Sequence, residues 1–186
     1  MKPIIDIYLI RHTKPLIAAG VCYGQLDCPV GDDYQQQFAK VSRYFKDKRV
    51  NAVYSSPLQR CAKLAEDLAK SHINQPVIYN DAFKEINFGD WEGEKWDDIA
   101  RVQIDAWNKN RLHFQFPNGE TPAQFHERVF QAWTEFVASL PAVSQNIIIV
   151  AHSGVICSLL CRQRDIPLEK MTELKVGYAS ISKITV

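Results

Sequence analysis

Residues 4–12 read IIDIYLIRH, an apolar run that is interrupted by Asp6 and stops at Arg11 and His12. Most of its apolar side chains are β-branched isoleucines. A short run of this kind is typical of a strand that is buried on both faces and feeds into a loop. We therefore predict an interior strand with an Arg-His pair at its carboxyl end.

Further strands and helices alternate along the chain. Strands are predicted at residues 51–55, 76–79, 145–151 and 180–186, and helices at 33–47, 56–72, 95–110, 121–140 and from 153 onward. This alternation predicts an α/β fold, a three-layer α/β/α sandwich with a largely parallel central sheet. Because no repeat or linker divides the chain, a single domain over residues 1–186 is expected.

Two of the predicted helices begin with the sequence of a capping box. Ser56 is followed three residues later by Gln59, and Thr121 is followed in the same way by Gln124. In this motif the hydroxyl and the glutamine side chain satisfy free backbone N–H groups of the first turn. We expect helices to start at Ser56 and at Thr121.

The composition excludes several classes of protein. Hydrophobic residues make up 46% and charged residues 23% of the chain, as in a globular protein. With a net charge of +1, nucleic acid and anionic membranes are not expected as partners. No stretch reaches the ~18 apolar residues of a membrane span, and the amino terminus is a poor signal peptide. Five cysteines without a disulfide-framework spacing favour a reduced, cytoplasmic setting.

Three groups of polar residues follow predicted strands, at residues 11–12, 55–60 and 152–154. In open α/β sheets, ligands bind at the carboxyl edge of the strands, so these groups are expected to meet there. Arginine forks match phosphate oxygens, and helix amino termini add backbone N–H donors. The sequence therefore predicts a phosphate site built from Arg11, His12, Arg60 and His152.

A phosphate site with two histidines indicates phosphoryl transfer as well as binding. A neutral imidazole can attack phosphorus and form a covalent intermediate. Fixed Arg and His⁺ groups can then replace Mg²⁺, so neither a metal nor another cofactor is expected. A carboxylic acid must protonate the leaving oxygen. On chemistry alone this acid could be Asp81, Glu85, Asp90, Glu92 or Glu94.

Four motifs resemble the signatures of the histidine phosphatase superfamily, also called phosphoglycerate mutase-like. LIRHT at 9–13 resembles LxRHG, and SSPLQRC at 55–61 resembles SSPLxRA. EINFGDWEG at 85–93 resembles ExxFGxWEG, and VAHSGVI at 150–156 resembles VxHGGxI. All four occur in the family's order and cover most of the chain.

The resemblance implies a role for each matching residue. His12 would be phosphorylated, and Arg11, Arg60 and His152 would bind the transferring phosphoryl group. Glu85, selected by its spacing to the FG pair, would protonate the leaving oxygen and then activate water. The resemblance also implies a phosphoglycerate mutase-like fold, a small phosphomonoester as substrate, and no metal.

The stretch RHTKPLIAAGVCYGQLDCPV at 11–30 departs from the general family pattern. It resembles the RHTxP and GxCYGxxDxP sequences of the α-ribazole phosphatase branch. Those enzymes remove the 5′-phosphate from the nucleotide that becomes the lower ligand of cobalamin. The resemblance therefore implies α-ribazole 5′-phosphate as substrate and a role in cobalamin biosynthesis.

Five further residues are candidates for substrate binding, each with a structural alternative. Thr13 follows the nucleophile, and Lys14 is either a ligand or a solvated loop charge. Tyr23 and Gly24 either touch the substrate or form a tight turn. Ser153 replaces a family glycine and either binds phosphate through its N–H group or caps a helix.

The segment 81–119 is expected to be an insertion that covers the substrate, with Trp91 and Trp96 near the site. Trp107 and Trp133 are expected in the core, Cys157 and Cys161 as small buried side chains, and Glu92 as a capping or pairing group of its loop. The other histidines are expected at the surface: His72, His113 and His126.

Other functions stay open at this point. Within the family the chain could be a broad phosphatase for sugar or nucleotide phosphates, or a phosphoglycerate mutase. From other classes, it could be a non-catalytic module that binds phospho-ligands, or a metal-dependent hydrolase. Assembly as a homodimer also stays open.

Overall fold

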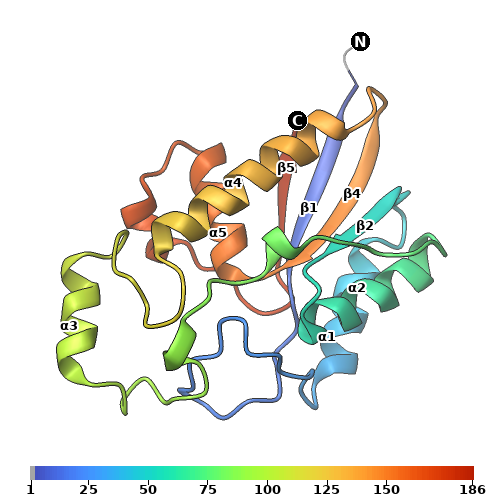
Figure 1. Cartoon of the computed structure of the whole chain (residues 1–186). Helices are drawn as coiled ribbons and strands as arrows, with labels where there is room; N and C mark the ends of the chain where they lie inside the picture. Colours follow the sequence, from blue (N-terminus) through green and yellow to red (C-terminus); the bar gives the residue numbers. More distant parts are fainter. Residues whose placement is uncertain (1–2) are drawn as a thin grey trace.

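One mixed sheet forms the centre of the computed structural model, which describes residues 3–186 (Figure 1). Its strands, in spatial order, are β3 (Ile78–Tyr79), β2 (Ala52–Ser55), β4 (Gln145–Ala151), β1 (Ile5–Arg11) and β5 (Ile181–Thr185). The first four are parallel to one another, and β5 is antiparallel to β1.

The two most apolar strands, β1 and β4, lie side by side at the centre of the sheet. Their register runs from Ile5 opposite Gln145 to Arg11 opposite Ala151. His12 and His152 are the next residues of the two strands, so this register brings both histidines to the same carboxyl edge.

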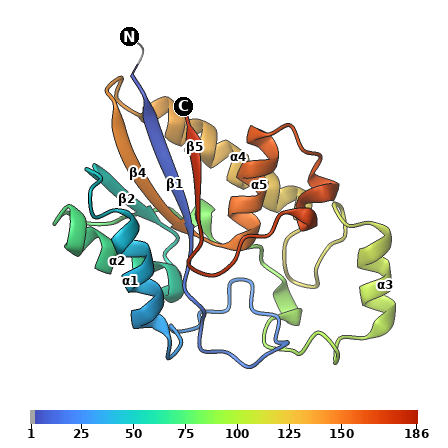
Figure 2. The same cartoon turned by 180° about the vertical axis from the view of Figure 1, so that it is seen from behind.

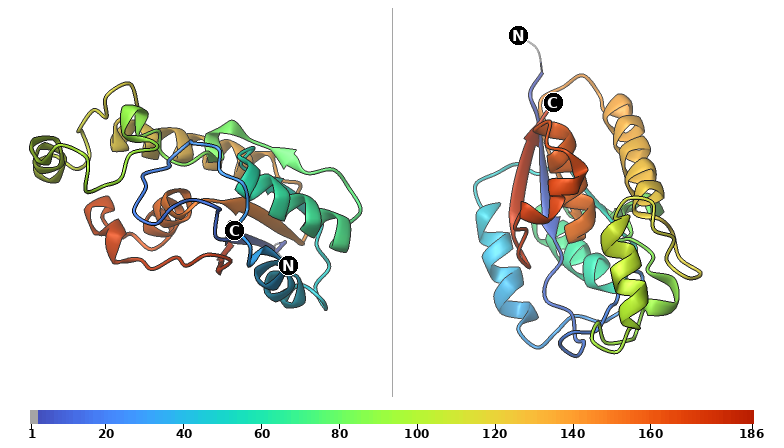
Figure 3. Two further views of the ribbon diagram at one scale, coloured as in Figure 1. Left: turned by 90° about the horizontal axis from the view of Figure 1, so that it is seen from below. Right: turned by 90° about the vertical axis from the view of Figure 1, so that its left-hand side faces the viewer.

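Helices cover both faces of the sheet, which confirms the predicted α/β/α sandwich (Figure 2). One layer contains α1 (Tyr34–Tyr44) and α2 (Gln59–His72), and the other contains α4 (Pro122–Ser139) and α5 (Ser153–Gln163). Alternate side chains of β1 point to opposite layers, as the strand period requires: Ile7 and Leu9 pack with α4 and α5, and Tyr8 and Ile10 with α1 and α2. Figure 3 (right) shows α1 and α4 on opposite sides of the sheet. Among residues 3–186, every helix is too short or too polar to span a bilayer.

The start of α2 differs from the prediction. The helix begins at Gln59, and Ser56 does not cap it. The Ser56 hydroxyl instead lies 2.9 Å from His152 Nε2. Asp27, from the loop between β1 and α1, accepts hydrogen bonds from the Gln59 backbone N–H at 2.8 Å and from the Gln59 side chain at 3.1 Å. At Thr121, by contrast, the predicted capping box is present.

The segment 81–119 forms a small aromatic cluster of its own beside the sandwich. It contains η1 (Asp81–Phe83), η2 (Gly89–Trp91) and α3 (Arg101–Lys109), and α3 lies away from the sheet in Figure 1. The helix predicted at 95–110 is shorter because residues 93–96 pair with residues 20–22. The Trp96 N–H donates to Gly20 O at 2.9 Å, and the Cys22 N–H donates to Glu94 O at 2.9 Å.

Candidate active site

His12 and His152 lie together, both buried, where β1 and β4 end. Their ring centroids are 5.1 Å apart with an interplanar angle of 61°. Arg60 is fully buried in the first turn of α2, after β2 ends, and Arg11 immediately precedes His12. The adjacent parallel strands thus gather the predicted groups at one edge of the sheet.

The hydrogen bond of His12 fixes its tautomer. Its Nδ1 lies 2.7 Å from the carbonyl oxygen of Thr13. Because a carbonyl oxygen only accepts, Nδ1 must carry the proton and Nε2 keeps its lone pair. Burial, and then the charge of Arg60, hold the pKa of His12 well below its ordinary value. At neutral pH this imidazole is therefore uncharged and nucleophilic at Nε2.

His152 is also neutral in the free protein. Burial and the neighbouring His12 lower its pKa well below the ordinary value. Its Nε2 lies 2.9 Å from Ser56 Oγ and 3.4 Å from Cys61 Sγ. The sequence analysis expected a positively charged histidine here, and the structure corrects this for the protein without ligand. His152 would become protonated only when an anionic phosphoryl group lies beside it.

Backbone carbonyls hold the two arginines in place. Arg60 donates to Leu26 O at 2.9 Å and to Gly24 O at 2.6 Å, and Arg11 donates to Val176 O at 2.6 Å. The buried Nε groups of both arginines find no hydrogen-bond partner among residues 3–186. These fixed guanidinium groups can donate to an anion.

Two tyrosines pack against the arginines. The Arg11 guanidinium carbon lies 3.9 Å from the centroid of the Tyr178 ring, and that of Arg60 lies 5.2 Å from the Tyr23 ring. The two hydroxyl groups are 3.0 Å apart. Tyr178 also contacts His12, with ring centroids 5.7 Å apart. It belongs to no motif, so the sequence carried no signal for it.

Glu85 is joined to the same edge through α5. Its Oε2 accepts a hydrogen bond from the Gly154 N–H at 3.0 Å, two residues beyond His152, and its Oε1 accepts from the Ile86 N–H at 3.3 Å. Burial raises the pKa of this carboxyl, although the hydrogen bond from Gly154 opposes the shift. Burial therefore favours the protonated form that a general acid needs.

A cavity of about 420 Å³ is lined by Glu85 and by other residues of segment 81–119, α4, α5 and η3 (Leu168–Glu173). Ser153 and Gly154, at the start of α5, also line it. Most of its wall is apolar and aromatic: Ile86, Phe88, Trp107, Leu112, Phe125, Met171 and Leu174. Arg111 and Glu169 add charged groups.

The tryptophan predictions are corrected by this cavity. Trp107, expected in the core, packs half-buried against the aromatic cluster of segment 81–119 and also lines the cavity. Trp91 and Trp96, expected near the substrate, pack instead in the aromatic cluster of segment 81–119. Trp133 lies in the main core, as predicted.

The structure places the other candidate residues as follows. Thr13 is buried, whereas Lys14 is exposed. Gly24 supplies the carbonyl that binds Arg60, and a Cβ there would lie 2.4 Å from Ile86 O. Its lack of a side chain therefore serves packing against segment 81–119. Ser153 is the first residue of α5.

Three minor predictions have clear outcomes. His126 was expected at the surface, but it is buried, with its Nδ1 2.8 Å from Ser158 Oγ, because α4 turns this side chain toward α5. Cys157 and Cys161 are buried, as predicted. Glu92 accepts a hydrogen bond within its loop, from the Phe88 N–H at 2.9 Å, as predicted, and a second from the Gln25 N–H at 2.8 Å, in the loop between β1 and α1. In the part of the chain that the structure describes, no three His, Cys, Asp or Glu side chains are grouped to hold a metal ion.

A model of the histidine phosphatase superfamily, branch 1, matches residues 7–186. The chain belongs to this superfamily. This histidine phosphatase is 27% identical over 186 residues to the adenosylcobalamin/alpha-ribazole phosphatase of Escherichia coli, covering 97% of the chain and 89% of that relative. It is also 27% identical over 165 residues to a metal-independent phosphoserine phosphatase of Arabidopsis thaliana, covering 86% and 68%.

A solved structure agrees with this assignment. The crystal structure of the alpha-ribazole phosphatase from Shigella flexneri superimposes with a TM-score of 0.83 at 27% identity, covering 96% of this chain and 89% of that one. The histidine phosphatase is thus a phosphomonoesterase of this family with the phosphoglycerate mutase-like fold.

The close contact between Gly154 and Glu85 gives a first prediction. A Cβ at Gly154 would lie 2.3 Å from Glu85 Oε1, so Gly154→Ala must displace the carboxyl group. We expect kcat/KM for an alkyl phosphate to fall by about 100-fold, the cost typical of misplacing a reacting group by about 1 Å. If Gly154→Ala kept full activity, the position of Glu85 would not matter to the reaction.

Proposed function

We propose that this histidine phosphatase hydrolyses phosphomonoesters through a phosphohistidine on His12. The observation that carries the proposal is the Nδ1–Thr13 hydrogen bond, which leaves a neutral, buried imidazole with a free Nε2 beside two fixed arginines. Binding alone would require neither this tautomer nor a buried carboxyl such as Glu85. These features argue against a non-catalytic binding module.

The first step forms the covalent intermediate. Nε2 of His12 attacks phosphorus, the P–O bond to the alcohol breaks, and protonated Glu85 gives its proton to the departing oxygen. Arg11, Arg60 and His152 neutralise the charge on the phosphoryl oxygens. Burial raises the pKa of Glu85, which supports the acid role.

The second step returns the enzyme to its starting state. Glu85, now ionised, takes a proton from a water molecule that attacks the phosphohistidine. The N–P bond breaks, and inorganic phosphate leaves with His12 neutral again. The same carboxyl group thus acts as a general acid toward the leaving oxygen in the first step and as a general base toward water in the second.

The best candidate substrate is α-ribazole 5′-phosphate. The sequence at 11–30 supports it, and so does the apolar, aromatic cavity that Glu85 lines. An alcohol that departs at Glu85 would extend into that cavity, where the side chains of Phe88, Trp107 and Phe125 in its wall would contact an apolar heteroaromatic base. Segment 81–119 supplies Phe88 and Trp107, which supports its proposed role as a substrate cover.

Phosphoserine is the second candidate, because the phosphoserine phosphatase relative is as similar to this chain as the alpha-ribazole phosphatase relative is. Its leaving group, serine, is small and charged. Such a group would leave most of a 420 Å³ apolar cavity without contacts. The cavity therefore favours the larger, aromatic substrate.

A substrate panel tests the proposal. We expect kcat/KM for α-ribazole 5′-phosphate to exceed that for phosphoserine, 3-phosphoglycerate and sugar phosphates by about 100-fold or more, since ~3 kcal/mol is the contribution of one well-buried aromatic group. Phosphate release would be measured in EDTA, and we expect full activity there. Equal rates across the panel would refute α-ribazole 5′-phosphate as the preferred substrate but would leave the mechanism in place. Activity that is lost only when EDTA is present would refute the metal-free mechanism.

A further inference from the structure

We propose that Arg128 and Glu120 form a clamp that positions Glu85 for proton transfer. The Arg128 clamp comprises these two side chains and the backbone that they hold. This inference rests on the proposed acid role of Glu85. Arg128 lies on α4, outside all four motifs, and it acts on the reaction through Glu85 as a positioning residue.

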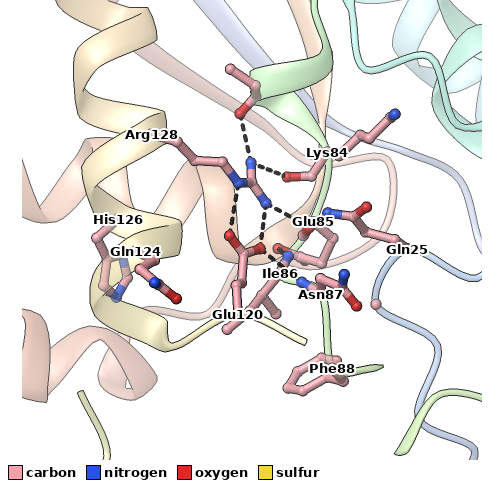
Figure 4. Close-up of polar contacts among 12 residues, drawn as sticks. Gln25, Lys84, Glu85, Ile86, Asn87, Phe88, Glu120, Gln124, His126 and Arg128 are labelled. Atoms are coloured by element: carbon pink, nitrogen blue, oxygen red, sulfur yellow. Dashed lines mark hydrogen bonds and ion pairs between the residues drawn. The ribbon is translucent and has the colours of Figure 1, made fainter. Parts of the chain in front are cut away.

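Arg128 binds the backbone immediately before and at the acid (Figure 4). Its Nη1 donates to Ala82 O at 2.9 Å and to Lys84 O at 3.0 Å. Its Nη2 donates to Glu85 O at 2.9 Å. One planar group thus fixes three carbonyl oxygens of the chain that leads into Glu85.

Glu120 orients the guanidinium and holds the chain after the acid. It accepts from Arg128 Nε at 3.0 Å and from Nη2 at 2.7 Å. The same carboxylate accepts the Asn87 N–H at 2.8 Å, and the Glu120 N–H donates to Asn87 O at 3.0 Å. Both partners are largely buried, with side chains 26% and 17% exposed. This pair is therefore more than a solvated surface ion pair.

The number of bonds explains why arginine occupies this position. A guanidinium has five N–H donors in a fixed fork. Arg128 donates five hydrogen bonds, three to backbone carbonyls and two to Glu120. A lysine has three donors on one nitrogen and cannot span the same set of acceptors.

The backbone of Glu85 depends on these contacts. Residues 84–88 lie between η1 and η2 and belong to no helix or strand. The Glu85 carbonyl is held from one side by Arg128 and from the other by Gln25 Nε2, at 3.0 Å. A general acid must stay within hydrogen-bond reach of the departing oxygen, so loosening its backbone should weaken proton transfer specifically.

The test compares Arg128→Lys with Arg162→Lys, using kcat/KM for an alkyl phosphate and for an activated aryl phosphate. Arg162 is the matched control because it is exposed and donates to one carbonyl, Phe130 O, at 3.1 Å. We expect Arg128→Lys to lower the alkyl value by about tenfold to 100-fold, as loss of a positioning contact does. The aryl value should change by less than about threefold, because a good leaving group needs no acid. Arg162→Lys should change neither.

A second variant and a double mutant separate this role from a purely structural one. Gln25→Leu removes the other donor to Glu85 O without touching the ion pair, and should lower the alkyl value selectively even if Arg128→Lys folds poorly. In the Glu85→Gln background, Arg128→Lys should cause no further selective loss. If Arg128→Lys lowered kcat/KM equally for both esters, while Glu85→Gln still affected mainly the alkyl ester, the clamp would be refuted and Glu85 would remain the acid. If Glu85→Gln were not selective, the acid assignment would fail, and the clamp with it.

Discussion

His12→Ala is expected to lower kcat for phosphomonoester hydrolysis by about 10⁵-fold or more, as removal of a covalent nucleophile does in other hydrolases. The structure gives the reason. His12 presents an unprotonated Nε2, and its neighbour His152 has that same nitrogen in contact with Ser56 and Cys61. His152 is therefore not poised to replace it.

Phosphate release from the best substrate of the panel would measure this loss. His72→Ala is the matched control, since His72 lies at the end of α2 and contacts Ser42 Oγ at 3.0 Å, outside the site. That variant should retain wild-type turnover. Activity of His12→Ala within about 100-fold of wild type would exclude His12 as the nucleophile.

Glu85→Gln is expected to act on the leaving group. The amide is nearly isosteric and its oxygen can still accept the Gly154 N–H, so the site should keep its shape. It cannot release a proton, and kcat/KM for an alkyl phosphate should fall by about 10²–10⁴-fold, the usual contribution of general acid catalysis. For an activated aryl phosphate kcat/KM should change little. Equal losses for both esters would show that another group is the acid.

The pH profile provides a second readout for the same variant. Glu85 acts in its protonated form, and burial raises its pKa, so activity should persist to higher pH than an ordinary carboxyl would allow and then fall. His12 acts in its neutral form, and its lowered pKa keeps activity at acidic pH until the imidazole is protonated. For the alkyl ester, the fall at high pH should be missing in Glu85→Gln, while the fall at low pH, which reports His12, should remain. The aryl ester needs no acid, so its profile should lack the fall from Glu85 already in the wild type.

The central sheet and the meeting of His12 and His152 at its edge could be predicted from the sequence because both depend on local signals. Buried parallel strands are continuous apolar runs, and β1 and β4 are of this kind. The residues directly after them, His12 and His152, then meet at the carboxyl edge of the sheet as a consequence of parallel pairing. These inferences required only the sequence of each strand and the residues directly after it, together with the general rule that parallel strands end at one edge.

The predictions that failed depend on distant partners. Ser56 has the sequence of a helix cap, but its hydroxyl contacts His152, and Asp27 caps α2 in its place. The helix expected from residue 95 begins only at Arg101, because the segment before it pairs with residues 20–22. His126 has no motif, yet packing of α4 on α5 buries it against Ser158.

The same reason explains the residues that the sequence analysis missed. Tyr178 and Arg128 reach the site from the loop before β5 and from α4, and neither carries a local signature of that contact. Trp107 lines the cavity because α3 lies away from the sandwich, an arrangement set by the aromatic cluster of segment 81–119. Such contacts are set by tertiary packing, which a single sequence does not specify locally.

Trapping the covalent intermediate tests the central claim most directly. Glu85→Gln should still form the phosphohistidine from an activated aryl phosphate but hydrolyse it slowly, since the base for the second step is missing. The reaction would be stopped in alkaline denaturant, in which the N–P bond survives, and peptides would be mapped by mass spectrometry. We predict a burst in which the amount of phenol released equals the amount of enzyme. We also predict one phosphoryl group per enzyme molecule, bound to His12. Phosphate on another residue, or turnover with neither burst nor labelled peptide, would contradict the mechanism.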